Sequence, residues 1–383
     1  MFILVINCGS SSAKYQLFDV RNGRSLARGL LERIGQSGAN LKHQPDGRVI
    51  HKNVVCKDHY VAIEIIIGML TDSEDGVINS KDDIFGIGHR VVHGGEEFKE
   101  STLITGKVIR SIEKYSELAP LHNPPSLLGI RACLEVLKGI PQVAVFDTSF
   151  HQTMPEEAFL YGLPFEYYKK YGIRKYGFHG TSHRYVSEEA ARRMARPLKS
   201  LKLITCHLGN GCSMAAIEKG KSVDTSMGFT PLEGLLMGTR CGDLDPAVVF
   251  YLMRKEKLTP QRISDILNKE SGLLGVSGVG NDMRDLLKGA RGRGAPAERC
   301  KLAIDIFIYR IKKYIGSYLA AMGGLDAVIF TAGISEHNPW LVRRITKDLK
   351  KVLPKKTRIL VVPTNEELLI ARDTYKIIKK GDK

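Results

Sequence analysis

The chain has 383 residues, 43% of them hydrophobic and 26% charged, which is typical of a globular protein with two or three domains. Its longest apolar stretches, at the N-terminus and at residues 61–70, are too short for a signal peptide or a membrane span, and seven cysteines without a CxxC pair argue against disulfides and zinc. We therefore expect a soluble, cytoplasmic protein whose net charge of +16, densest at residues 347–358, belongs to a solvated surface and to no nucleic-acid or membrane partner.

Two similar groups of three short strands are predicted about 200 residues apart. In each group a turn of Gly, Ser or Asn residues follows the first apolar strand. This recurrence suggests a duplicated domain whose two copies face each other across one ligand-binding cleft. The predicted strands are residues 2–6, 14–20 and 25–30 in the first group and 201–208, 212–217 and 222–226 in the second.

Strands and helices alternate in the rest of the chain, which indicates an α/β fold with mixed sheets. Asn123 is the predicted cap of a helix with proline in its first turn, and a long helix with isoleucines on one face ends at Gly323-Gly324. The expected strands are 84–92, 142–146 and 326–331, and the expected helices are 124–137, 297–322 and one that begins at Asn338-Pro339.

The two turns of small residues are candidates for phosphate binding. Successive backbone N–H groups in such a turn point into one concavity, which suits an anion. Asn7, Ser10 and Ser12 add side-chain oxygens to the first turn, and Lys14 could reach a phosphate. Neither turn is a Walker A loop, and each alone is also compatible with an ordinary hairpin turn.

Charged and imidazole side chains stand at predicted strand ends or in glycine-rich loops, where α/β proteins tend to hold catalytic groups. Arg90 lies in GHRVVHGG, Asp147 in VFDTSFH, His179 in YGFHGTSHR and Arg240 in GTRCGDLDP. A fixed guanidinium suits a carboxylate or a phosphate. Structural alternatives are a core ion pair for Arg90, helix capping for Asp147 and a surface position for Arg240. His122 in LHNPP could cap a helix or bind a ligand.

Two adjacent glutamates stand in the segment VPTNEELL near the C-terminus. Thr364 as N-cap of a helix would place Glu367 at the N3 position and complete a capping box. Glu366 is then left without a structural role, so it is the candidate ligand of a hydrated metal ion.

Ten segments, in order and covering nearly the whole chain, resemble the acetate kinase family, within the superfamily of sugar kinases, actin and heat-shock chaperone ATPases. They are NCGSSSAKYQLFD, GHRVVHGG, APLHNPPSLLGI, VFDTSFHQTMP, YGFHGTSHRYVS, HLGNGCSMAAI, MGFTPLEGLLMGTRCGDLDP, NDMRDL, FTAGIS and PTNEELLIARDT. The resemblance implies two duplicated actin-like, ribonuclease H-like domains facing a central cleft. Residues 1–147 with the C-terminal helix 364–383 would form the carboxylate and metal domain, and 148–363 the nucleotide-binding domain.

The resemblance also implies an activity, the reversible Mg²⁺-assisted transfer of the γ-phosphoryl group of ATP to acetate. The products would be acetyl phosphate and ADP, Mn²⁺ would be an alternative metal, and the assembly would be a homodimer. A propionate or butyrate kinase is the alternative within the family, and an actin-like or chaperone-like ATPase is the alternative outside it. A carboxylate is already a nucleophile at neutral pH, so alignment and charge neutralisation favour direct in-line transfer over a phosphoenzyme.

Residue roles follow from the same resemblance. Arg90, Arg240 and His179 would hold the carboxylate and the transferring phosphoryl group, and Asp147 would position or polarise the acceptor. The metal ligands would be Asn7 and Glu366, both through water. The apolar pocket around the substrate would comprise Val92, Leu121, Phe178 and Pro231, and His122 would also bind the substrate. The ATP-binding residues would be Ser10, Ser12, Lys14, His207, Leu208, Gly209, Asn210, Gly211, Asp282, Met283, Arg284, Gly333, Ile334, Ser335, Glu336 and His337.

One segment departs from the family pattern. The family usually has TAGIGEN where this chain has TAGISEH, so Ser335 replaces a glycine and His337 an asparagine. If the glycine needs a positive φ, the nucleotide loop must shift.

Overall fold

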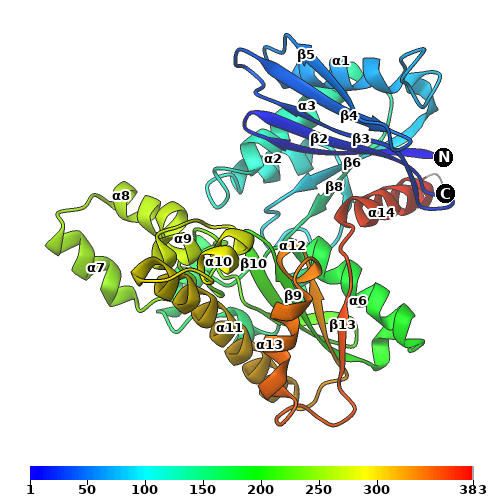
Figure 1. Cartoon of the computed structure of the whole chain (residues 1–383). Coiled ribbons are helices and arrows are strands. Elements are labelled where there is room, and N and C mark those ends of the chain that lie inside the picture. Colours follow the sequence, from blue (N-terminus) through cyan, green and yellow to red (C-terminus); the bar gives the residue numbers. More distant parts are fainter. Residues whose placement is uncertain (382–383) are drawn as a thin grey trace. The chain divides into compact units, whose positions relative to one another are not determined.

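The computed structural model describes residues 1–381, which divide into two compact units. Unit 1 comprises Met1–Phe150 and the chain from Asn365 onward, and unit 2 comprises His151–Thr364. Each unit contains one mixed sheet with helices packed on it (Figure 1).

Unit 1 is built on an eight-stranded sheet in the order β5-β4-β3-β2-β1-β6-β8-β7. Its first five strands are antiparallel neighbours, whereas β1, β6 and β8 run parallel. The strands are β1 (Phe2–Gly9), β2 (Ser12–Asp19), β3 (Arg24–Glu32), β4 (Ala39–Pro45), β5 (Ile50–Val54), β6 (Ile84–Val91), β7 (Thr102–Leu103) and β8 (Gln142–Phe146). The helices are α1 (His59–Leu70), α2 (Gly106–Lys114), α3 (Asn123–Val136) and α14 (Glu366–Gly381).

Unit 2 has a five-stranded sheet in the order β11-β10-β9-β12-β13. The strands are β9 (Lys202–Leu208), β10 (Cys212–Glu218), β11 (Lys221–Thr225), β12 (Ala327–Thr331) and β13 (Arg358–Val361). The helices are α4 (Glu156–Phe159), α5 (Phe165–Tyr171), α6 (Gly180–Met194), α7 (Pro246–Lys255), α8 (Pro260–Asp265), α9 (Gly272–Ser277), α10 (Met283–Gly289), α11 (Ala295–Met322), α12 (Gly333–Glu336) and α13 (Pro339–Leu349).

The two sheets repeat one strand order. The run β3-β2-β1-β6-β8 of unit 1 corresponds to β11-β10-β9-β12-β13 of unit 2. In both, three antiparallel strands are followed by two parallel ones. The predicted duplication and the α/β class are therefore confirmed, and all six strands of the two groups are present with ends that differ by up to three residues from the prediction.

Alternation along β6 explains how unit 1 covers both faces of its sheet. Ile87 belongs to the apolar core that α1 and α3 share with β1 and β2. The flanking glycines point the other way, where a Cβ on Gly86 would lie 2.2 Å from Ile378 and one on Gly88 2.4 Å from Thr374, both on α14. The C-terminal helix thus lies close against β6 because two positions of that strand have no side chain.

The long helix α11 is the core helix of unit 2. Ile304, Ile308, Ile311 and Ile315 are buried, as their spacing predicts. The helix begins at Ala295, two residues before the predicted start, and its cap Gly323 has a left-handed φ of 61°. Glycine tolerates this conformation without strain, which explains where the helix ends.

The predicted cap of α3 is wrong. Asn123 is the first residue of the helix, and His122 at the cap position makes no side-chain cap hydrogen bond. The buried Asn123 amide instead accepts from the His93 N–H at 3.0 Å and donates to the His93 carbonyl at 2.9 Å. The local sequence pattern assigned the Asn123 side chain to helix capping. In the structure it bonds instead to the backbone of a residue 30 positions earlier in the chain.

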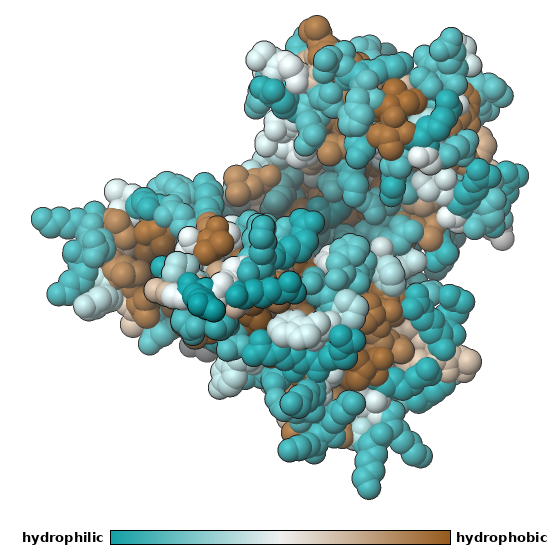
Figure 2. Space-filling model, viewed as in Figure 1, coloured by the Kyte–Doolittle hydropathy of each residue, from teal (hydrophilic) through white to brown (hydrophobic). Residues whose placement is uncertain are grey.

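None of the helices in residues 1–381 combines the length and the hydropathy that crossing a bilayer requires. On the face shown in Figure 2, apolar side chains form separate patches among hydrophilic ones.

Substitution of Gly88 by alanine should destabilise unit 1. The added Cβ would meet Thr374 Oγ1 at 2.4 Å and Ile370 Cγ2 at 2.6 Å, so α14 must move away from β6. We expect a loss of about 1–3 kcal/mol in the free energy of unfolding, measured by urea titration with circular dichroism.

The matched control is Gly68→Ala in α1, where no atom lies within 4 Å of the added Cβ. This change should stabilise the helix by up to about 1 kcal/mol. If the Gly88→Ala protein is as stable as the parent, the packing of α14 on β6 does not require a residue without a side chain at this position.

Candidate functional site

A cluster of two carboxylates and one guanidinium lies at the C-terminal edge of the sheet of unit 1. The parallel strands β6 and β8 end side by side, with Arg90 paired to Val145 and the Asp147 N–H bonded to the Val91 carbonyl at 2.9 Å. Arg90 forms a hydrogen-bonded ion pair with the buried Asp147, and its Nε lies 3.9 Å from Glu366 Oε2. Three residues to which the family resemblance assigns separate roles, Arg90, Asp147 and Glu366, therefore lie together.

The electrostatics of this cluster favour a further cation. Burial raises the pKa of Glu366 to about 7, and repulsion from Asp147 and Glu367 adds to the effect, while Arg90 and Lys14 oppose it. Two carboxylates share one arginine, so a bound cation would relieve their repulsion and favour the charged form of Glu366.

The predicted capping box of α14 is wrong. Asn365 caps the helix, because its Oδ1 accepts from the Leu368 N–H at 3.0 Å. Glu367 instead pairs with Lys14 of β2 at 2.6 Å. Thr364 contacts the Ser182 hydroxyl at 2.9 Å. Glu366 has no capping role, as expected. The expectation rested on a capping box completed by Glu367, and that box does not form.

The donor set of unit 1 fits a hydrated Mg²⁺ ion. Asn7 lies on β1 beside β6, one residue beyond the Ile6–His89 pairing, so its amide belongs to the same strand edge as Arg90. Magnesium prefers oxygen ligands and is usually held by one or two carboxylates, with water and substrate phosphates completing its shell. Within residues 1–381 no group of three or more His, Cys, Asp or Glu side chains could hold a metal ion alone.

His179 has a strained backbone in unit 2. It is the cap residue of α6 with φ 54° and ψ 25°, a left-handed conformation that a residue with a side chain rarely adopts. Such strain costs on the order of 1–3 kcal/mol and persists where the surroundings hold the residue in place. Its ring stacks on His207 with 4.3 Å between centroids, and this contact helps to fix its orientation.

A chain of hydrogen bonds runs inward from His179. Its Nδ1 lies 2.8 Å from Ser213 Oγ, which lies 2.7 Å from Nε2 of His183, whose Nδ1 lies 2.7 Å from Thr205 Oγ1. Burial lowers the pKa of His183 well below its usual value, so that ring is neutral. The Ser213 hydroxyl has one proton and can donate to only one of the two imidazoles. The ring tautomers of His179 and His183 are therefore coupled through Ser213.

Arg240 is a half-buried cation without a counter-charge. Its Nη1 donates to the Pro231 carbonyl at 3.2 Å and lies 3.9 Å from the Met237 sulfur, and it makes no ion pair in the described part of the chain. Burial lowers the pKa of its guanidinium. A Cβ added to Gly211 would lie 3.4 Å from both Arg240 Nη1 and His179 Cε1, so the second small-residue turn meets both groups. A guanidinium that has lost part of its hydration and lies beside the backbone of a small-residue turn favours the binding of an anion.

A cavity of about 730 Å³ lies next to this turn in unit 2. Its size is that of a nucleotide or a similar ligand. The lining residues are Gly209, Asn210, Asn281, Asp282, Met283, Arg284, Gly333, Ile334, His337 and Asn338.

Comparisons with known proteins agree with this arrangement. Residues 2–353 match the model of the acetokinase family. The chain belongs to that family. It is 53% identical to an acetate kinase from Halothermothrix orenii, covering 99% of this chain and 100% of the relative. It is also 44% identical to the crystal structure of Porphyromonas gingivalis acetate kinase, with a TM-score of 0.93, covering 98% of this chain and 99% of that one.

A second solved structure, a propionate kinase from Francisella tularensis, is 40% identical with a TM-score of 0.90 and covers 98% of this chain and 99% of its own. The family match ends at residue 353, so α14 with Glu366 lies outside it. The acetate kinase relative nevertheless extends over this helix, because 99% of the chain is covered.

The predicted ATP-binding residues of unit 2 divide into those that line the cavity and those that do not. Eight of the predicted ATP residues line it, and reasoning from the sequence missed Asn281 and Asn338, although each adjoins a predicted segment. The other predicted residues of unit 2, His207, Leu208, Gly211, Ser335 and Glu336, are not among its lining.

Glu336 and Ser335 have structural contacts that explain their positions. The Glu336 carboxylate accepts from the Ala332 N–H at 2.7 Å and from the Thr364 N–H at 3.2 Å. Ser335 donates to the Thr331 carbonyl at 2.5 Å and has no positive φ. The left-handed residue of this loop is Ala332, with φ 68°, so the serine that replaces the family's glycine does not force the backbone to shift.

The remaining predicted residues lie on both units. In unit 1, Val92 is buried and Leu121 is 73% exposed, while Ser10 lies in the β1–β2 turn and Ser12 is the first residue of β2. In unit 2, Phe178 is buried; the Pro231 carbonyl contacts Arg240.

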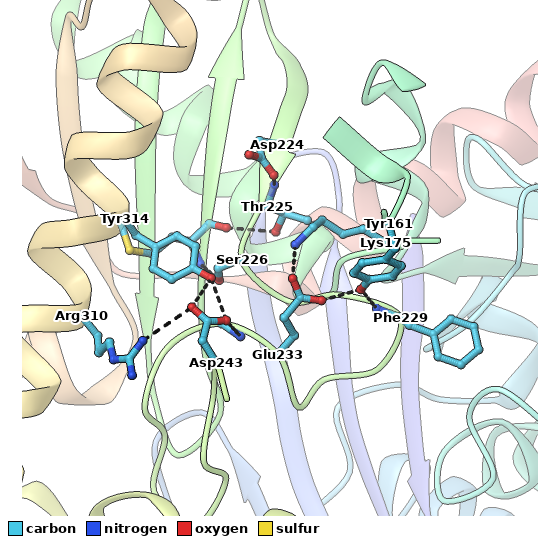
Figure 3. Close-up of polar contacts among 12 residues, drawn as sticks. Tyr161, Lys175, Asp224, Thr225, Ser226, Phe229, Glu233, Asp243, Arg310 and Tyr314 are labelled. Carbon is cyan, nitrogen blue, oxygen red and sulfur yellow. Dashed lines mark hydrogen bonds and ion pairs between the residues drawn. The ribbon is translucent and has the colours of Figure 1, made fainter. Parts of the chain in front are cut away.

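A polar network supports the loop that carries Arg240 (Figure 3). Asp243 accepts from the Gly234 N–H at 2.9 Å and from the Tyr314 hydroxyl of α11 at 2.9 Å. Glu233 accepts from Lys175 at 2.6 Å and from the Tyr161 hydroxyl. Both carboxylates therefore bind groups other than Arg240. Their contacts hold the loop in place and do not neutralise the charge of Arg240.

Substitution of Ser213 by alanine should uncouple the two imidazoles. Without the shared hydroxyl, the ring tautomers of His179 and His183 should shift, and ¹⁵N NMR of labelled histidine would detect the change. Leaving buried ring nitrogens unpaired should also cost about 1–3 kcal/mol of stability.

Ser187→Ala is the control, because this buried serine of α6 donates only to the Arg184 carbonyl at 2.8 Å. It should leave both histidine spectra unchanged. Unaltered spectra in Ser213→Ala would show that the serine does not link the rings.

Proposed function

We propose that this chain catalyses the reversible transfer of the γ-phosphoryl group of ATP to acetate, giving acetyl phosphate and ADP. The observation that carries the proposal is the half-buried Arg240, which has no counter-charge and adjoins His179 and the glycine turn. The acetate kinases to which the chain is similar over its whole length support the same activity.

The reaction needs little covalent chemistry from the protein. A carboxylate oxygen of acetate forms a bond to the γ-phosphorus while the bond to the bridging oxygen breaks, and that electron pair leaves with ADP. Arg240 and His179 would neutralise charge on the transferring phosphoryl group, and Arg90, oriented by Asp147, would hold the acceptor carboxylate. Asn7 and Glu366 would hold Mg²⁺, or Mn²⁺ in its place, through water. The bound ion supplies further neutralisation of phosphate charge.

The division of labour between the units is also a proposal. Unit 1 would contribute the acceptor and metal groups, and unit 2 the nucleotide cavity with its turn at Gly209 and Asn210. Lys14, Ser10 and Ser12 would contact ATP phosphates, which requires Lys14 to leave its pair with Glu367. Its side chain is 55% exposed, so that rearrangement costs little.

Acetate is the proposed acceptor. A propionate or butyrate kinase is the alternative, and the similarity to a propionate kinase supports the first of these two. The residues that the family resemblance assigns to the acceptor pocket are stiff, since Val92 is β-branched and Phe178 and Pro231 have rigid rings, so we expect room for only one or two carbons. We further propose a cytoplasmic homodimer without nucleic-acid or membrane partners.

A hydroxamate assay with ATP and a panel of acetate, propionate and butyrate tests the function. We expect acyl phosphate from acetate first, less from propionate and little from butyrate. ATP consumption that does not depend on any carboxylate would favour the actin-like ATPase alternative, and preference for butyrate would reject the small pocket.

Arg240→Ala should lower kcat by about a hundredfold or more, the usual cost of removing one preorganised donor from a transition state. The acetyl hydroxamate assay measures this effect. Arg254→Ala, which removes an exposed arginine of α7, is the control and should leave kcat unchanged. A kcat close to that of the parent protein in Arg240→Ala would remove the arginine from the mechanism.

Glu366→Ala should raise the Mg²⁺ concentration needed for half-maximal rate by about tenfold or more, because one group that orders the metal's water is lost. Glu367→Ala is the control. It breaks the partly exposed pair with Lys14, worth up to about 1 kcal/mol, and should leave the Mg²⁺ requirement nearly unchanged. The opposite pattern would move the metal ligand to Glu367.

A further inference from the structure

A basic trough runs along α13 in unit 2. One cavity of about 750 Å³ is bounded by α10, α11 and α13, and a shallower hollow of about 390 Å³ continues it along the same helix. The two share Trp340, Arg343 and Arg344. His337 and Asn338 form a wall that the larger cavity shares with the nucleotide cavity, so the trough begins where that cavity ends.

The exposed stripe of α13 explains the character of the trough. Trp340, Arg343, Lys347 and Lys350 recur at spacings of three, four and three residues, which is one face of a helix. The opposite face, including Leu341, Ile345 and Leu349, is buried. Hydrophilic side chains cover most of the region over α10 and α13 on the face shown in Figure 2.

The trough has a large excess of positive charge. Three cations of α13 and Lys350 just after it line the trough, Arg291 and Lys301 add two more, and Asp305 is the acidic residue of the lining. Asp305 is already bonded to Arg344 at 2.5 Å. Within residues 1–381, Arg291, Arg343, Lys347 and Lys350 make no ion pair. Like charges that line one hollow repel each other, so an anion there lowers the energy of all of them.

Trp340 adds a second kind of contact. It is the single tryptophan of the sequence and is 44% exposed. The Arg344 guanidinium carbon lies 5.3 Å from the centre of its ring, which orients the indole beside the cations. A half-exposed indole next to arginines can stack on a planar base whose phosphates reach the cations.

We propose that this trough is a second binding site for a nucleoside polyphosphate, with its base on Trp340 and its phosphates along Arg343 and Lys347. Residues three or four positions apart on a helix have Cβ atoms about 5–6 Å apart, so neighbouring cations of the stripe can contact one short phosphate chain. The volume of about 750 Å³ suits one nucleotide. Single-stranded nucleic acid fits less well, because it needs several aromatic platforms and the trough contains one.

The occupant would act on the nucleotide cavity through the shared wall. A ligand in the trough contacts the segment at His337 and Asn338, and so changes the affinity of the neighbouring cavity for its own nucleotide. The coupling is reciprocal, because each ligand must change the affinity for the other by the same factor. This step rests on the proposed function, in which the neighbouring cavity binds the substrate ATP.

The test counts bound ATP and follows Trp340. Equilibrium dialysis of the whole chain with labelled MgATP, without acetate, should find two ATP molecules per chain. The double variant Arg343→Gln with Lys347→Gln should bind one, and its Trp340 fluorescence should respond to ATP at least about tenfold more weakly. A charge-matched control, Lys199→Gln with Lys221→Gln, removes two exposed lysines away from the trough and should bind two.

Several other outcomes would contradict the proposal. One ATP per chain in the parent protein, or two in the Arg343→Gln, Lys347→Gln variant, overturns the proposal. Tripolyphosphate that competes as tightly as ATP rejects stacking on Trp340, and an oligonucleotide that competes far more tightly makes the trough a nucleic-acid site. The double variant should form acetyl phosphate with the parent kcat, because neither residue lines the nucleotide cavity, but the dependence of its rate on ATP concentration should change because the coupling is lost. Because the hydroxamate assay reports the proposed function separately, a failure of the second site is distinguishable from a failure of that function.

Discussion

The uncompensated charge of Arg240 is the constraint on which the site in unit 2 depends. Desolvating a guanidinium is unfavourable unless an anion or several acceptors replace its water. Here one carbonyl and a distant sulfur do so, whereas the carboxylates of the same loop, Glu233 and Asp243, are engaged elsewhere. This arrangement lowers the stability of the protein, and in the proposed function it keeps a cation available for an anionic ligand. The strained backbone of His179 beside it is a second cost of the same kind.

Unit 1 has the opposite imbalance. Asp147 and Glu366 share Arg90, and burial together with mutual repulsion disfavours a charged Glu366. A cation relieves that repulsion, as an anion relieves the isolation of Arg240. A metal ion and a phosphoryl group are the two charges that a phosphoryl-transfer enzyme must hold, so the imbalance in each unit has the sign that the chemistry requires.

Sequence reasoning succeeded where a feature depends on neighbouring residues. Apolar runs and glycine turns predicted every strand of the two repeated groups, and the isoleucine spacing predicted α11. It failed where a side chain has a distant partner. Asn123 was assigned to a cap but bonds to His93, and Glu367 was assigned to a capping box but pairs with Lys14, 353 residues away. The hydrogen bonds that link His179 to Ser213 and Ser213 to His183 could not be predicted from the sequence. No spacing in the sequence marks a serine that lies between two imidazoles.

The duplicated sheets show what repetition in a sequence does and does not predict. Each small-residue turn connects the second and third strands of the same five-strand order, β2 and β1 in unit 1 and β10 and β9 in unit 2. In unit 2 the turn lines a cavity through Gly209 and Asn210, and its Gly211 leaves space beside Arg240. In unit 1 the corresponding strand carries Lys14, which is held by α14. Helix α14 packs on the bare glycines of β6, and the lining of the cavity in unit 2 comes instead from α10 and the start of α12. A shared turn therefore predicts a shared backbone geometry, while the helix packed beside it decides whether that geometry meets a ligand.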